Sequence, residues 1–253
     1  MSAFLISALA CLTMLAGAVA GAGLRRLLPA HHLDDQSKDI VRLGSALLAT
    51  MSALVLGLLI TSAKNAYDLQ RSEVRQIAAK LVLLDNQLNR WGPEAQPARQ
   101  VLRASMPAMV ERIWGERAVQ RSTGAPFQPS PEGELVYAAL ENLTPQTEVQ
   151  RLLKNQAFTT IAYITELRVL LSEQADSGLP APLLIVLVFW LSALLASFTL
   201  FSRVNPTSAC ALLIIALSAA GAIFMIEELA SPFNGLLRIP TEPLGNALGV
   251  LAP

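Results

Sequence analysis

One stretch of the sequence places small and weakly polar residues at a spacing that could serve the passage of ions. The positions recur in steps of three and four along a run that we expect to be helical: Ala46, Thr50, Ala53, Gly57, Thr61 and Lys64. They share one face, since successive helical residues turn by about 100°. The stripe continues into the charged residues Asp68, Arg71 and Arg75. A narrow face that carries hydroxyl groups and ends in charges could line a water-filled path, with Lys64 and Arg71 attracting anions to its mouth. The stripe alone fits helix–helix contact in a bundle better, so both interpretations stay open.

Residues able to carry out catalysis are scarce. The only histidines, His31 and His32, are adjacent, and with Asp34 and Asp35 they match no known spacing of metal ligands. Neither a Ser-His-Asp set nor a phosphate-binding loop is found. We therefore expect no enzyme, no catalytic residue, no bound metal and no cofactor. A formal net charge of zero also argues against nucleic acid as a partner, because proteins that bind it need a basic surface.

The stripe lies within an uninterrupted stretch, residues 39–89, which predicts one continuous helix. The stretch has no proline, and its only glycines are Gly44 and Gly57. Its first part, residues 43–63, carries no charge and is long enough to cross a bilayer core of about 30 Å. The composition agrees with a membrane protein, since 53% of the residues are hydrophobic and 15% are charged. From Lys64 onward the chain is polar but contains no helix breaker, so the helix should continue into water.

A second stripe on the same helix predicts the face that packs against the rest of the chain. Its members recur in steps of three and four, except between residues 63 and 70: Ser45, Ala49, Ser52, Leu56, Leu59, Ala63, Gln70, Val74, Ile77, Leu81, Leu84 and Leu88. This is the seam of a helix packed at coiled-coil-like angles. Small residues in the lipid part would allow close backbone approach, and leucines in the aqueous part would bury apolar surface.

Three further uncharged stretches predict membrane spans, at residues 3–23, 183–201 and 209–226. Gly17 and Gly21 in the first stretch form a GxxxG pair, which suits close packing against another span. We therefore predict an all-α, four-span integral membrane protein with a helical stalk domain between spans two and three. The predicted parts are spans one and two at 1–63, the extramembrane helical stalk at 64–181, spans three and four at 182–228, and a C-terminal tail at 229–253.

Turn signals divide the predicted stalk into helices. Gly92 and Pro93 stop the long helix and start another, because glycine suits a helix C-terminus and proline the first turn of a helix. The second helix should run to about Arg117, with a kink at Pro107. A loop rich in Pro, Gly and Ser follows at 119–134. Ser130-Pro131 should cap a short helix that runs through Val136, Tyr137 and Leu140.

The last stalk helix is expected to begin at Thr144 and to end near Asp176. Thr144 offers a capping hydroxyl, and Pro145 suits the first helical position. The length of this helix matches the aqueous part of the long helix, so the two should pair antiparallel. No strand pattern is convincing anywhere. The C-terminal tail should be mostly irregular, with a last turn at 244–251.

Several short pieces of the chain occur in a fixed order between about residues 39 and 251. They are Leu54-Val55-Leu56-Gly57-Leu58-Leu59 with Ser62-Ala63-Lys64, Gly92-Pro93-Glu94-Ala95 with Arg99, Leu102 and Arg103, Gln150-Arg151-Leu152, Phe189-Trp190-Leu191, Ala219-Ala220-Gly221-Ala222-Ile223-Phe224, and Pro232-Phe233-Asn234-Gly235-Leu236 with Pro243-Leu244. Each piece is weak alone, whereas the ordered set is specific. Together they resemble the bacterial bestrophin-like membrane proteins, long catalogued only as a domain of unknown function.

The resemblance implies four spans and a distant kinship to bestrophins, which are pentameric anion channels. It implies a homo-oligomer, preferably a pentamer, in the bacterial inner membrane, with the lipid bilayer and an inorganic anion as partners. It also marks a structural set: Gly92, Pro93, Glu94, Arg99, Glu228, Pro232, Phe233 and Gly235. The chain departs from the family at Ala230, where an acid is usual, and at Val169, where Trp is usual. The phenylalanine-rich neck on the second span of bestrophins is absent.

The side of the membrane on which the stalk lies, and the function, stay open at this stage. Lys and Arg near the spans place the stalk outside the cytoplasm by the positive-inside rule, whereas a bestrophin-like arrangement places it inside. An oligomeric channel with span two lining the pore competes with a non-conducting membrane scaffold or envelope-sensing interaction protein. The small-residue stripe favours the channel. The lack of a charge in mid-membrane disfavours ion-coupled active transport.

Overall fold

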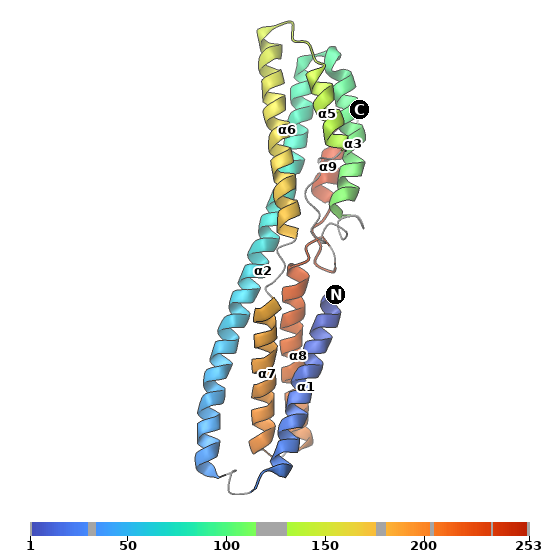
Figure 1. Ribbon diagram of the computed structural model, residues 1–253. Helices are drawn as coiled ribbons and strands as arrows, with labels where there is room; N and C mark the ends of the chain where they lie inside the picture. The colour runs from blue at the N-terminus through green and yellow to red at the C-terminus, as the bar shows by residue number, and fades with distance from the viewer. Residues whose placement is uncertain are drawn as a thin grey trace. The chain divides into compact units, whose positions relative to one another are not determined.

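The computed structural model describes residues 2–29, 34–114, 131–175, 181–202, 205–233 and 235–251. Their elements are, in order, α1 (Ala3–Leu27), α2 (Asp35–Trp91), the short 3-10 helix η2 (Pro93–Ala95), α3 (Gln96–Trp114), α5 (Pro131–Glu141), α6 (Glu148–Ala175), α7 (Ala181–Phe201), α8 (Pro206–Leu229) and α9 (Glu242–Leu251) (Figure 1). Within these ranges every regular element is a helix, which confirms the all-α prediction. Helices α1, α2, α7 and α8 are each long and apolar enough to cross a membrane.

The chain divides into two compact units. The membrane unit comprises Met1–Ala66 and Gly178–Ala230, and the helical unit comprises Tyr67–Ser177 and Ser231–Pro253. Helix α2 contributes residues to both units, and residues from Ser231 onward belong to the helical unit. The histidines at 31 and 32, the helix ends expected near Arg117 and Asp176, and the part of the expected loop at 119–130 lie outside the described residues. The rest of that loop, 131–134, is helical instead and forms the start of α5.

Small residues let α1 and α7 approach each other closely in the membrane unit. A methyl group at Gly17 or Gly21 would overlap backbone atoms of α7. The hydroxyl of Thr199 on α7 donates a hydrogen bond to the carbonyl oxygen of Ala18 on α1, at 2.8 Å. The predicted GxxxG contact is therefore confirmed, and its partner is span three. The helix itself runs four residues beyond the predicted end at residue 23, to Leu27.

The first part of α2 packs in the membrane unit through one narrow face. Leu59 and Ala63 are buried in a small cluster with one residue each from α7 and α8. Nearer the start of α2, the Ser45 hydroxyl shares a hydrogen bond of 2.9 Å with that of Ser197 on α7. The helix begins four residues before the predicted boundary, because Asp34 caps it. Hydrogen bonds from Ser37 hold the pKa of the Asp34 carboxyl below its usual value.

The helical unit has an apolar core of its own. The predicted seam of α2 is buried there at every position from residue 70 onward: Gln70, Val74, Ile77, Leu81, Leu84 and Leu88. The seam meets residues from α3, α5, α6 and α9 in one cluster. Side-chain hydrogen bonds join Gln87 to Thr160 at 3.2 Å and Glu73 to Gln174 at 2.9 Å. Residue numbers rise along α2 as they fall along α6, which confirms the antiparallel pair.

Helix α6 begins later than predicted, at Glu148 instead of Thr144. The hydroxyl of Thr147 accepts a hydrogen bond from the backbone N–H of Gln150 at 3.2 Å, so Thr147 is the cap. The side-chain oxygen of Gln150 in turn accepts a hydrogen bond of 2.8 Å from the backbone N–H of Gln146. Thr147 prevails because it has a Gln three residues later, as a capping arrangement requires, and Thr144 does not.

The C-terminal segment is more ordered than predicted. Where a single last turn was expected, α9 runs for ten residues. Ile239 and Leu244 are buried in the core of the helical unit. The backbone N–H of Ile239 donates a hydrogen bond of 2.7 Å to the carbonyl oxygen of Pro232. Gly235, with a φ of 91°, lets the chain double back between these two residues. The tail is therefore folded onto the core.

Candidate ion path and its supporting contacts

The small-residue face of α2 is exposed along its whole length in the single chain. Exposure is shared by all six members of the set: Ala46, Thr50, Ala53, Gly57, Thr61 and Lys64. A methyl group added at Gly57 would meet no atom within 4 Å. The other side of the helix is closed, because Ser52, Leu59 and Ala63 are buried. None of the helices that the structure describes therefore packs over this face at Gly57.

The two hydroxyl groups of this face are bonded to their own helix. Thr50 donates to the carbonyl oxygen of Leu47 at 2.7 Å, and Thr61 donates to that of Gly57 at 2.8 Å. Hydrogen bonds of this kind leave the hydroxyl oxygen as an acceptor on the surface. The face thus combines small apolar side chains with hydroxyl oxygens, and it carries no charge until Lys64.

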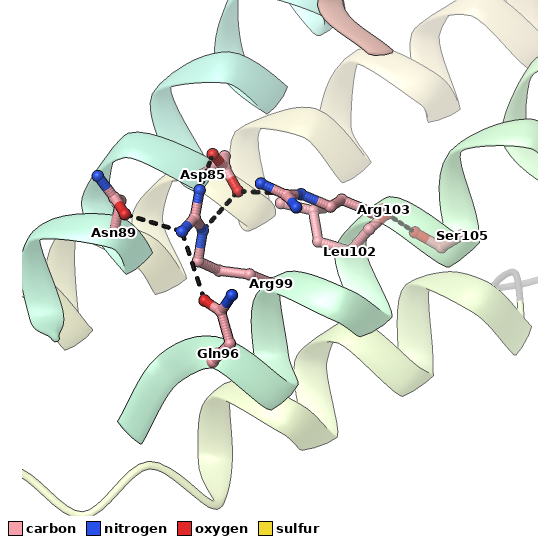
Figure 2. Close-up of polar contacts among 7 residues, drawn as sticks. All are labelled: Asp85, Asn89, Gln96, Arg99, Leu102, Arg103 and Ser105. Carbon is pink, nitrogen blue, oxygen red and sulfur yellow. Dashed lines mark hydrogen bonds and ion pairs between the residues drawn. The ribbon is translucent and has the colours of Figure 1, made fainter. Parts of the chain in front are cut away.

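A second constellation fixes α3 to α2 in the helical unit. The Arg99 guanidinium binds the Asp85 carboxylate through two contacts, Nε to Oδ1 at 2.9 Å and Nη2 to Oδ2 at 2.8 Å (Figure 2). Nη1 of Arg99 also donates to Asn89 Oδ1 at 2.8 Å. The Asp85 side chain is only 8% exposed, so the ion pair is nearly buried. A two-pronged pair of this geometry is both strong and directional.

Arg99 was expected from the sequence, whereas Asp85 was not. The hydrogen bond that Arg99 donates to Asp85 raises the pKa of Arg99 above its usual value, so this side chain stays charged. The guanidinium of Arg103 approaches the same carboxylate, with its Nε 3.9 Å from Asp85 Oδ1 (Figure 2). One signal could have revealed Asp85. It is a lone acid between Leu84 and Leu88 of the seam, where burial requires a partner.

The family model described as Bestrophin-like domain matches residues 12–244 of this chain. The chain belongs to the bestrophin-like family. This membership confirms the resemblance in the sequence and makes the protein an integral membrane protein with apolar spanning helices. The set of small residues on α2 and the Asp85 constellation both lie inside the matched range. Among curated proteins, none matches the chain.

Solved structures show that the bestrophin-like chain shares the fold of bacterial bestrophins over almost its whole length. A variant of a bestrophin homologue from Klebsiella pneumoniae is 13% identical with a TM-score of 0.68, and the match covers 99% of this chain and 98% of that one. Another structure of a Klebsiella pneumoniae homologue is 14% identical with a TM-score of 0.66, covering 98% and 96%. A structure described only as a membrane protein is 14% identical with a TM-score of 0.70, and the match covers 98% of this chain and 96% of that one. At these identities the likeness concerns the fold alone.

Some of the bestrophin-like sequence pieces fall at turns and helix ends, whereas those at 54–59, 189–191 and 219–224 lie inside α2, α7 and α8. Gly92 has a φ of 121°, which L side chains rarely adopt, and it lets the chain pass from α2 into η2. Pro93 occupies the first position of η2, and Glu94 is exposed beside it. At the end of α8, Glu228 is buried and Ala230 is the C-cap in a helical conformation. Ala230 is the position where the family usually has an acid.

Two more residues of the structural set lie in the turn after α8. Pro232 is buried, and its carbonyl oxygen receives the hydrogen bond from Ile239 described above. Phe233 is half-buried, with its ring edge-on to that of Trp114 and centroids 5.9 Å apart. The indole nitrogen of Trp114 donates to the carbonyl oxygen of Ile239 at 2.9 Å. Pro232 and Phe233 thus help to hold the C-terminal segment.

A group of buried polar atoms in the helical unit was missed by the sequence reasoning. Glu73 is 4% exposed, and its Oε1 accepts a hydrogen bond from Gln174 Nε2 at 2.9 Å. The remaining oxygens of Glu73 and Gln174, and that of Gln70, lack a hydrogen-bond partner in the described protein. Among the described residues no three His, Cys, Asp or Glu side chains lie close enough together to hold a metal ion.

Proposed function

We propose that this bestrophin-like chain forms a homo-oligomeric channel for inorganic anions in the bacterial inner membrane, with the small-residue face of α2 lining the path. The observation that carries the proposal is the two-sidedness of α2 in the membrane unit. One face is buried against α7 and α8, and the face from Ala46 to Lys64 is exposed. An exposed face of small and hydroxyl-bearing residues is unusual for contact with lipid alone, and suits water or close contact with another copy.

Several copies are needed to enclose such a path. The four spans of one chain leave the face uncovered at Gly57, so enclosure must come from symmetry-related α2 helices. Closed cyclic symmetry is the usual arrangement of soluble homo-oligomers, and it would bring identical faces around one axis. The kinship with bestrophins favours five copies. Native mass spectrometry in mild detergent should show this oligomer, and monomers alone at micromolar concentration would contradict it.

The sign of the charge at the end of the face supports anions. Lys64 is exposed at the point where the uncharged stretch ends. Farther along the same stripe Asp68 and Arg75 are exposed and Arg71 is half-buried, so the cations outnumber the acid. Rings of cationic side chains at a mouth raise the local concentration of anions. We therefore expect Lys64→Glu to shift the permeability ratio of the channel towards cations, without changing the fold of an exposed helix position.

The deciding experiment measures ion flux through purified protein in liposomes. Gly57→Leu should strongly reduce anion flux, because a large side chain there projects from the proposed lining. The matched control is Gly44→Leu. A Cβ at Gly44 also meets no atom within 4 Å, so both variants should fold. Gly44 lies about 140° around the helix from Gly57 at 100° per residue. Flux through Gly44→Leu should therefore resemble that of the wild type.

Two results would overturn the channel proposal. Wild-type protein that carries neither anions nor cations in several buffers would favour the non-conducting scaffold. Equal loss of flux from Gly57→Leu and Gly44→Leu would show that side chains anywhere on α2 disturb the assembly, and that the small-residue face has no special position. Retention of the oligomer in native mass spectra of both variants checks that loss of flux is not loss of assembly.

A further inference from the structure

A groove in the membrane unit borders one end of the proposed path and shares Ala46 with it. It has a volume of about 590 Å³ and runs between the first turns of α2 and the last turns of α7. Its lining has two chemically distinct parts. Charged side chains come from the start of α2, namely Asp35, Lys38, Asp39 and Arg42. Apolar and hydroxyl-bearing side chains follow, namely Val41, Ser45, Ala46, Ala49, Ser197, Phe198, Phe201 and Ser202. This volume is within the usual range for small-molecule sites.

The two parts match two levels of a bilayer. Arg42 is the last charged residue before the uncharged stretch at 43–63. On α7, Phe201 is the last helical residue. The charged part of the groove therefore lies where headgroups end, and the part lined by Ala49 and Phe198 lies at the depth of the first acyl carbons. An amphipathic molecule with a charged head and an apolar tail fits this order.

The charges of the groove are balanced, and two of them already satisfy each other. Lys38 Nζ lies 2.8 Å from Asp35 Oδ1 in an ion pair. Within the described residues, the side chains of Asp39 and Arg42 form no hydrogen bond or ion pair with another side chain. They are three residues apart on α2 and therefore share a face, one carboxylate beside one guanidinium. Such a pair is complementary to a zwitterion, with a phosphate for Arg42 and an ammonium for Asp39.

We propose that this groove binds one phospholipid with a primary ammonium headgroup, of the phosphatidylethanolamine class. Arg42 holds the phosphate, Asp39 accepts hydrogen bonds from the ammonium, and the first part of an acyl chain lies against Phe198 and Ala49. The acyl chain contributes little to the affinity of the groove for one lipid over another, because the surrounding lipid is as apolar as the groove. Selection must therefore come from the headgroup, which predicts that lipids with the same chains and different heads are distinguished.

The test compares lipids that differ only in the headgroup. Delipidated full-length protein is mixed with phosphatidylethanolamine, phosphatidylcholine or phosphatidylglycerol of identical acyl chains, and retained lipid is measured by native mass spectrometry. Wild-type protein should retain phosphatidylethanolamine about tenfold better than phosphatidylcholine, whose quaternary ammonium cannot donate hydrogen bonds. Asp39→Asn should bring this ratio close to one. Arg42→Gln should weaken retention of all three lipids, since each carries a phosphate.

A control variant and two contrary results complete the test. Glu148→Gln changes an exposed acid of the helical unit and should leave the ratio unchanged. Equal retention of the three lipids by wild type, or a preference for phosphatidylglycerol, would overturn the proposal. So would an Ala49→Trp variant that fills the groove and dissociates the oligomer while keeping its lipid, because the occupant would then be a second copy. Lipid retention needs no ion flux, so this test stands whether or not the chain conducts.

Discussion

Gly21 on α1 lies so close to Ala196 on α7 that a methyl group on Gly21 would overlap the Ala196 carbonyl oxygen. The two helices meet backbone to backbone at this point. Gly21→Ala should therefore push them apart and destabilise the membrane unit by about 1–3 kcal/mol, the usual cost of overpacking. Thermal unfolding of the purified protein in detergent should show a lower midpoint.

Gly23 provides the matched control for this prediction. It belongs to the same helix, and a methyl group there would meet no atom within 4 Å. Gly23→Ala should leave the midpoint unchanged or raise it slightly, since alanine is the better helix former. If Gly21→Ala and Gly23→Ala behave alike, the close contact between α1 and α7 does not stabilise the protein.

The ion pair between Asp85 and Arg99 should be costly to break from one side. Asp85→Ala leaves a nearly buried guanidinium without its carboxylate, a loss of about 3–5 kcal/mol in comparable sites. The exposed pair between Glu148 and Arg151 serves as control, with side chains 82% and 62% exposed. Glu148→Ala should cost less than about 1 kcal/mol. Chemical denaturation of both variants gives the two values, and a similar small cost for both would show that Asp85 is solvated.

Phe233 should stabilise the C-terminal segment through its contact with Trp114. Phe233→Ala is expected to cost about 2 kcal/mol, less than the 3–5 kcal/mol of a fully buried ring, because Phe233 is only half-buried. Leu236→Ala, at a side chain 82% exposed in the same turn, should have no effect. Limited proteolysis of the C-terminal segment, together with thermal unfolding, separates the two variants. Unchanged protection in Phe233→Ala would mean that the turn holds without its aromatic contact.

The cap of α6 gives a prediction that distinguishes two neighbouring threonines. Thr147→Ala should destabilise the helical unit by about 1 kcal/mol, since it removes the hydroxyl that accepts from the Gln150 N–H. Thr144→Ala removes an exposed side chain outside the helix and should cost far less. Circular dichroism during thermal unfolding provides both midpoints. If Thr144→Ala lowered the midpoint more than Thr147→Ala, α6 would begin at Thr144, as the sequence predicted.

The sequence predicted the parts of the fold that depend on periodicity. The buried seam of α2 follows from leucines spaced by three and four, and the contact of α1 follows from Gly17 and Gly21. Both signals are local in the chain and have a single physical meaning, burial of one helix face. The exposed stripe from Ala46 to Lys64 was also identified, but a stripe alone cannot tell an ion path from a contact between copies.

The features that the sequence did not predict depend on contacts between distant residues. Asp85 and Arg99 are fourteen positions apart, and only the fold of α3 against α2 makes them partners. The groove beside Arg42 requires α7, more than 150 residues later in the chain. The start of α6 was misplaced for another reason, since Thr144 and Thr147 offer the same group and only the position of Gln150 separates them.

The hydroxyl groups of Thr50 and Thr61 set a limit on what the proposed path can distinguish. Each hydrogen is already engaged with a carbonyl oxygen of α2, at 2.7 and 2.8 Å. A passing anion therefore finds no donor there to replace the water that it would shed. The anion must keep its own hydration shell, so chloride, bromide and iodide should cross at similar rates. Lys64 at the entrance would then select anions over cations, and the path itself would discriminate between anions only by their hydrated size.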